Sequence, residues 1–101
     1  MQLQQISVQA LQTLFEQNQP LFLLDVRNPN EFQVFNLGGY LIPLPELAHR
    51  LDEIPRDVPV VVYCHSGYRS QVALEFLQSV GITDVKNLSG GVHAWQQLIA
   101  S

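Results

Sequence analysis

The chain has 101 residues, of which 47% are hydrophobic and 14% charged, and its formal net charge is −4 at pH 7. A second independent core would leave each half too small to be stable, so we expect one domain over residues 1–101. The five Lys and Arg residues are scattered, which argues against nucleic-acid binding, because a phosphate backbone requires a clustered basic surface. No stretch approaches the ~20 apolar residues that cross a bilayer, and residues 1–5 lack the basic start of a signal peptide. We therefore expect a cytoplasmic protein without a membrane anchor.

The first elements are recognisable from capping residues and apolar runs. Ser7 is expected to cap a helix whose apolar positions, beginning at Val8, recur at helical spacing until Pro20 ends the pattern. A short strand is expected before this helix. Residues 21–25 and 58–63 are apolar runs without alternation, which is typical of strands buried on both faces of a parallel sheet.

Two helical segments are expected between these strands. The first begins at Asn28 and Pro29, a capping residue followed by proline, and ends before the glycines at 38–39. The second begins at Pro45 and ends at Pro55, with its apolar residues on one face.

The last third of the sequence predicts a helix, a strand and a final helix. Residues 70–80 carry apolar side chains at helical spacing, and Gly81 is suited to a left-handed stop. Residues 85–88 predict a strand, and the glycines at 90–91 lead into a helix that contains Trp95.

Alternation of strands and helices predicts the fold class. We expect an α/β fold with a mostly parallel central sheet of four to five strands and helices on both faces. Open sheets of this kind bind ligands beyond the carboxyl ends of their strands. Cys64 follows the strand predicted at residues 58–63, so it should lie at that edge.

Cys64 is the only cysteine, so it cannot form an intrachain disulfide or a cysteine-based metal cluster within one chain. A helix N-terminus just after it would favour an anion and lower the pKa of the thiol. Gly67 allows successive amides to face inward, Arg69 adds positive charge, and Ser66 and Ser70 add hydroxyl donors. Two plainer interpretations stay open: a small buried hydrophobic side chain, or a loop that binds phosphate or sulfate without chemistry.

The loop resembles the active loop of the rhodanese family, which runs Cys-x-Ser-Gly-x-Arg-Ser. This chain has Cys64-His65-Ser66-Gly67-Tyr68-Arg69-Ser70. The resemblance extends to three further stretches, which are Leu24-Asp25-Val26-Arg27 with Glu31-Phe32, Gly38-Gly39 with Ile42-Pro43-Leu44, and residues 88–95 with their Gly90-Gly91 and Trp95.

The resemblance implies a rhodanese-like domain and a thiosulfate sulfurtransferase. By it, Cys64 accepts a sulfane sulfur from a small anionic donor such as thiosulfate, becomes a persulfide, and passes the sulfur to cyanide, a thiol or a protein acceptor. Cys64 and Arg69 are the expected catalytic residues, and no cofactor or metal is expected. The expected substrate-binding residues are His65, Ser66, Gly67, Tyr68 and Ser70. Asp25 and Arg27 are expected to support the site, by pairing with each other or with the backbone.

Three other functions are alternatives to a sulfurtransferase: a cysteine phosphatase, a persulfide carrier and an interaction module. A cysteine phosphatase has a Cys-x5-Arg loop, whereas four residues separate Cys64 from Arg69 here and make a smaller ring. A persulfide carrier would receive sulfur from a cysteine desulfurase and relay it. An interaction module would use the scaffold without turnover. The sequence does not identify the donor, and His65 either adds positive charge to the loop at mildly acidic pH or points to solvent.

Overall fold

The computed structural model describes residues 4–101. The expectation that residues 1–3 begin no signal peptide lies outside the described residues. The strands are β1 (Gln5–Ile6), β2 (Phe22–Asp25), β3 (Tyr40–Leu41), β4 (Val60–Tyr63) and β5 (Val85–Leu88). The α-helices are α1 (Val8–Glu16), α2 (Pro29–Val34), α3 (Tyr68–Ser79) and α4 (Gly91–Ala100). Two short 3-10 helices, η1 (Leu44–His49) and η2 (Leu51–Glu53), precede β4.

The five strands form one sheet in the order β1-β5-β4-β2-β3, and all neighbours are parallel. This confirms the predicted α/β class and the mostly parallel sheet of four to five strands. Asp25 of β2 lies opposite Tyr63 of β4, and Val62 of β4 lies opposite Asn87 of β5. The register therefore brings the carboxyl ends of β2, β4 and β5 to the same edge of the sheet.

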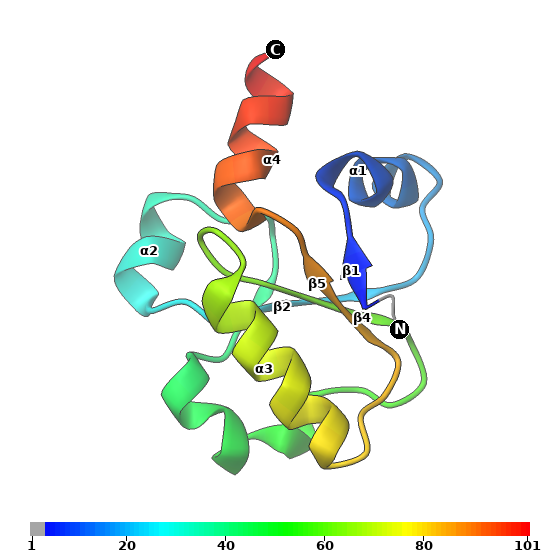
Figure 1. Ribbon diagram of the computed structural model, residues 1–101, viewed down its shortest axis with the longest axis vertical. Helices are drawn as coiled ribbons and strands as arrows, with labels where there is room; N and C mark the ends of the chain where they lie inside the picture. Colours follow the sequence, from blue (N-terminus) through cyan, green and yellow to red (C-terminus); the bar gives the residue numbers. More distant parts are fainter. Residues whose placement is uncertain (1–3) are drawn as a thin grey trace.

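Helices cover both faces of the sheet, as predicted (Figure 1). Successive side chains of a strand point to opposite faces, so Val60 and Val62 enter one core and Val61 and Tyr63 enter the other. The first core is closed by α3 and the 3-10 segment, and the second by α1 and α4. Because β4 is buried on both faces of the sheet, its sequence is a continuous apolar run.

The helix starts and stops follow local rules that the sequence carries. The Ser7 Oγ accepts a hydrogen bond from the Ala10 N–H at 3.0 Å, which confirms it as the cap of α1. Asn28 caps α2 through a capping box with Glu31, whose backbone N–H donates to the Asn28 Oδ1 at 2.9 Å. Gly81 has a φ of +92°, so it is left-handed after α3 as expected.

The structure differs from the sequence prediction in the segment between α2 and β4. Strand β3 was not predicted, because two residues are too short to show a period. The expected helix between Pro45 and Pro55 is instead η1 and η2, which are separated at Arg50. Arg50 departs from helical geometry, with φ −129° and ψ 25°, and the Leu47–Leu51–Ile54 spacing that places apolar residues on one face does not require continuous α-helix.

A second difference concerns α3, which begins at Tyr68 rather than at Ser70. Gly67 has a φ of +110° and turns the chain directly into the helix. The loop after β4 is thus shorter than predicted, and Arg69 and Ser70 lie in the first turn of the helix.

A buried ion pair stabilises the ends of β2 and α2. Asp25 has no exposed surface and Arg27 is 3% exposed. The Arg27 Nη2 donates to the Asp25 Oδ2 at 2.8 Å and to the backbone oxygen of Phe35 at 2.7 Å, just after α2. Burial opposes the charge of Arg27, but its hydrogen bonds to Asp25 prevail and raise its pKa above the ordinary value. The guanidinium also lies over the Tyr63 ring, 5.6 Å from the centroid.

We expect the substitution Arg27→Met to reduce the free energy of unfolding by ~3–5 kcal/mol, because it leaves the Asp25 carboxylate buried without its partner. Arg50→Met is the matched control, since Arg50 is partly exposed and its ion pairs should contribute below ~1 kcal/mol. Urea denaturation of both variants measures the difference. Equal losses would contradict a special contribution from the buried pair.

Candidate active site

Cys64 comes directly after β4 and its sulfur lies at the N-terminus of α3. The Sγ is within hydrogen-bonding distance of the Gly67 N–H at 3.1 Å, the Ser70 N–H at 3.3 Å and the Ser70 Oγ at 3.3 Å. Cys64 is 1% exposed, so these donors replace water around the sulfur. The arrangement fits an anionic sulfur, because unpaired amides of a first helical turn carry the positive end of the helix dipole.

The balance of two effects sets the acidity of this thiol. Burial raises the pKa of Cys64, because the thiolate loses its hydration. Hydrogen bonds from the Ser70 hydroxyl and from the amides of Ser70, Gly67 and Ser66 lower it, and together they bring the pKa below the ordinary value. The thiol is buried and yet more acidic than a free cysteine.

Helix α4 is hydrogen-bonded to the backbone of the loop of residues 64–70. The Val92 N–H donates to the Cys64 carbonyl oxygen at 3.0 Å, and the His93 N–H donates to the His65 carbonyl oxygen at 2.9 Å. A Cβ at Gly91 would collide with both of these oxygens, and Gly91 has a φ of +56°. The glycine at this position therefore has a steric reason as well as a conformational one.

Arg69 is paired with Glu31 of α2. The Arg69 Nη1 and Nη2 donate to the two carboxylate oxygens of Glu31 at 2.7 Å and 2.9 Å. The bond from Arg69 is the main cause that lowers the pKa of Glu31 to about 2. The expected positive charge of Arg69 is therefore at the site, but a carboxylate already balances it.

The remaining loop residues present their side chains to solvent. His65 and Ser66 are exposed, and Tyr68 is 78% exposed. The His65 ring lies 5.9 Å from the His93 ring, centroid to centroid. Of the predicted substrate-binding residues, Gly67, Ser70 and the Ser66 backbone amide thus act on the sulfur, while the side chains of His65, Ser66 and Tyr68 are exposed.

A groove of about 430 Å³ runs beside the loop, between α2 and α4. It is lined by Arg27, Asn30, Glu31, Val34, Phe35, His65, Val92 and Gln96. The exposed Val34, at 87%, adds an apolar edge to it. The groove therefore extends from Glu31, the partner of Arg69, to the exposed residue His65.

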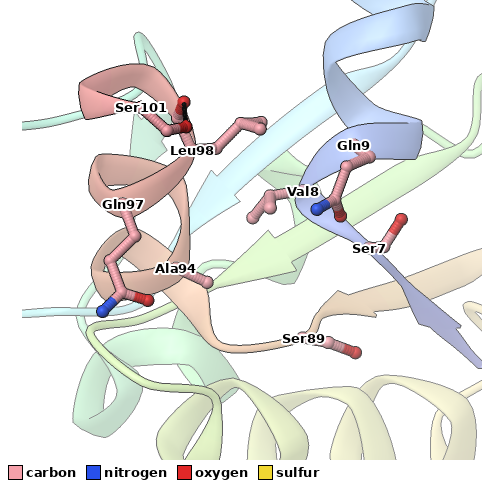
Figure 2. A pocket seen from close by; sticks show the side chains of 8 residues that line it. All are labelled: Ser7, Val8, Gln9, Ser89, Ala94, Gln97, Leu98 and Ser101. Atoms are coloured by element: carbon pink, nitrogen blue, oxygen red, sulfur yellow. Dashed lines mark hydrogen bonds between the residues drawn. The ribbon is translucent and has the colours of Figure 1, made fainter.

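A second hollow, of about 420 Å³, lies between α1 and α4 (Figure 2). Its lining residues are Ser7, Val8, Gln9, Ser89, Ala94, Gln97, Leu98 and Ser101. Val8 and Leu98 lie between the two helices, with polar side chains around them. None of its lining residues belongs to the loop of residues 64–70 or carries a charged side chain, so this hollow is not the candidate active site.

Two side chains at the site were not predicted from the sequence. Glu31 was noted only as part of a motif, and its contact with Arg69 spans 38 positions of the chain. Asn87 was treated as part of a strand, although it is 4% exposed and lies behind Ser70. The available signal was its spacing from Val85, because residues two apart on a strand share a face and a buried amide requires hydrogen-bond partners.

Within residues 4–101, no three His, Cys, Asp or Glu side chains are grouped to bind a metal ion. In the same part of the chain, no helix is both long enough and apolar enough to span a bilayer.

Comparison with known proteins places these features in a family. Residues 7–98 match the family model described as the rhodanese-like domain. The uncharacterized protein YqhL of Bacillus subtilis (strain 168) is 45% identical over 74 residues, which cover 72% of this chain and 59% of YqhL. The thiosulfate sulfurtransferase GlpE of Vibrio cholerae serotype O1 is 32% identical over 93 residues, which cover 91% of this chain and 87% of GlpE. The crystal structure of a rhodanese-like domain protein from Staphylococcus aureus superimposes with a TM-score of 0.85 at 28% identity, covering 92% of this chain and 91% of the other.

We expect Gly91→Ala to displace the loop, because the new methyl group would overlap the carbonyl oxygens of Cys64 and His65. The loss in unfolding free energy should be ~2–4 kcal/mol, from overpacking and left-handed strain together. Gly38→Ala is the control, since Gly38 is also left-handed but open space surrounds it, and strain alone should cost ~1–2 kcal/mol. Urea denaturation and the alkylation rate of Cys64 report the two effects, and equal behaviour of the variants would exclude the steric explanation.

Proposed function

Because this chain belongs to the rhodanese-like domain family, we propose that it is a sulfurtransferase in which Cys64 carries a sulfane sulfur as a persulfide. The observation that carries the proposal is the Sγ of Cys64, which lies at the N-terminus of α3 among the Gly67 and Ser70 donors. Cysteine chemistry needs a thiolate, and these donors favour one at a residue that is 1% exposed.

The proposed cycle has two displacement steps. In the first, the Cys64 thiolate attacks the outer sulfur of thiosulfate, an S–S bond forms to Sγ, and sulfite leaves with the electron pair of the broken S–S bond. In the second, an acceptor such as a thiolate or cyanide attacks the outer sulfur, and Sγ leaves as the thiolate. The charge is conserved in each step, and no other redox reagent is required.

Arg69 is the proposed residue for positioning the anionic donor. Two of its five guanidinium N–H groups bond Glu31, and within residues 4–101 the other three have no protein acceptor. Those three can donate to an anion at the entrance without breaking the pair. His65, Ser66 and Tyr68 would contact the donor or acceptor at the rim, while the Gly67 and Ser70 amides stabilise charge on sulfur.

A persulfide carrier is the second candidate, and one observation favours it. Tyr68 at the start of α3 and Val34 at the groove are large, highly exposed hydrophobic side chains. A small anion does not need such a surface, whereas a protein that delivers or receives sulfur would cover it. Both functions use the same persulfide and would operate in the cytosol, where reducing conditions keep the thiol available. The four-residue spacing between Cys64 and Arg69 disfavours phosphate transfer.

Incubation with thiosulfate, without reductant, should add the mass of one sulfur atom to the protein, and cyanide should remove it as thiocyanate. Intact-mass spectrometry follows the protein and a colorimetric assay follows thiocyanate. The Cys64→Ser control should gain no sulfur, because its hydroxyl cannot form a persulfide. Sulfur gained from a cysteine desulfurase but not from thiosulfate would select the carrier, and no gain from either donor would contradict the proposal.

The substitution Arg69→Gln should raise the KM for thiosulfate about tenfold, the effect of losing one hydrogen bond to a charged group. The value of kcat at saturating cyanide should change less, because Arg69 is assigned to the binding of the donor. Arg50→Gln, which also breaks ion pairs with glutamates, is the control and should leave KM unchanged. An Arg69→Gln variant with the wild-type KM would remove Arg69 from donor binding.

A further inference from the structure

A cluster of amide side chains contacts the loop, and none of its members lines the groove. The Asn87 Nδ2 is within hydrogen-bonding distance of the Gly67 backbone oxygen at 3.2 Å, the Gln71 Oε1 at 3.1 Å and the Gln5 Oε1 at 3.3 Å. The amide nitrogen faces three oxygen acceptors, so the opposite orientation, which would direct Oδ1 at them, is unfavourable. The Asn87 Oδ1 must therefore point toward Ser70.

The Ser70 hydroxyl has one proton and two possible acceptors. Its Oγ is hydrogen-bonded to the Asn87 Oδ1 and lies 3.3 Å from the Cys64 Sγ. Ser70 is fully buried and Asn87 is 4% exposed, so solvent does not provide another donor for the Asn87 Oδ1 in its contact with the Ser70 Oγ. Since an amide oxygen only accepts, the Ser70 proton is needed in the bond to Asn87. While the proton lies in that bond, Oγ presents a lone pair to Sγ, which suits a thiol. When the proton turns to Sγ it stabilises a thiolate, and the Asn87 Oδ1 loses its donor.

We propose that Asn87 is a positioning residue that acts on Cys64 through Ser70, by competing with the sulfur for the Ser70 hydroxyl proton. A thiolate at Sγ can take this proton as a hydrogen bond only if the bond to Asn87 is given up. The amide therefore makes the empty thiolate less stable than the loop would make it without Asn87.

The same competition distinguishes the empty state from the sulfur-loaded state, a consequence that rests on the proposed function. In a persulfide the negative charge lies on the outer sulfur, and Sγ is a neutral, two-coordinate atom. Ser70 can then keep its bond to Asn87 without loss. Asn87 thus favours the states in which Sγ is uncharged, the thiol and the persulfide, over the free thiolate.

The charged and titratable groups around the loop are separate from this competition. Two ion pairs join groups on α2, α3 and the end of β2, two histidine rings lie near each other, and Glu75 of α3 accepts a hydrogen bond from the Gln71 Nε2. The groups are Asp25, Arg27, Glu31, Arg69, His65, His93 and Glu75. None of them is hydrogen-bonded to Asn87, so a neutral substitution there leaves their field on Sγ in place.

The test is the pH dependence of iodoacetamide alkylation, followed by intact mass in the absence of any sulfur donor. Cys64 is the only cysteine, so each rate reports one thiol. Asn87→Leu should lower its pKa by about one unit, the size of one hydrogen bond to a charged group, and so speed alkylation about tenfold well below the pKa. In the Ser70→Ala background the same substitution should leave the pKa unchanged, because the proton that Asn87 competes for is absent.

Gln71→Leu is the matched control, because it removes one partner of the Asn87 Nδ2 and leaves the contact between Oδ1 and Ser70. Its pKa should equal that of the wild type. Should Asn87→Leu fail to fold, Asn87→Ala replaces it with the same expected sign.

Two results would overturn the assignment. One is a pKa that rises or stays the same when Asn87 is replaced. The other is an equal shift with and without the Ser70 hydroxyl, which would mean that Asn87 acts by holding the loop through Gly67. Since no sulfur donor is present, failure to form a persulfide in the earlier experiment would contradict the sulfurtransferase proposal and leave this test intact.

Discussion

The site depends on one constraint, the parallel alignment of three central strands at a shared edge. The ends of β2, β4 and β5 carry Asp25, Cys64 and Asn87 to this edge, and their register sets how far each residue projects. Parallel strands require crossover connections, so α3, which joins β4 to β5, begins at this edge, and α4 begins there because it follows β5. The sulfur therefore meets a helix N-terminus as a result of the topology, and no separate ligand is needed to place it there.

Charge at the site is balanced pair by pair. Asp25 is matched by Arg27, and Glu31 is matched by Arg69, which leaves the sulfur to be stabilised mainly by neutral donors. Burial without such donors would favour the thiol, so acidity at Cys64 depends on hydrogen-bond geometry more than on net charge. This is consistent with a protein whose overall charge is negative.

The backbone of the loop is hydrogen-bonded to two independent elements. Helix α4 binds the carbonyl oxygens of Cys64 and His65, and the Asn87 amide binds the carbonyl oxygen of Gly67. Each contact links segments more than 18 positions apart, so loss of one element would loosen the sulfur site without touching the cysteine. Support of this kind keeps donors at a fixed distance from the charge they stabilise.

Local chemistry in the sequence determined the α/β class, the capping of α1 by Ser7, the buried strand β4 and the position of Cys64 at the carboxyl edge, because periodicity and capping depend on near neighbours. It misplaced the start of α3 and missed β3, where two residues show no period. Tertiary structure alone decided that Arg69 pairs with Glu31 and that Asn87 lies behind Ser70. Those contacts join segments that are distant along the chain, and only the packed sheet and its helices bring them within hydrogen-bonding distance.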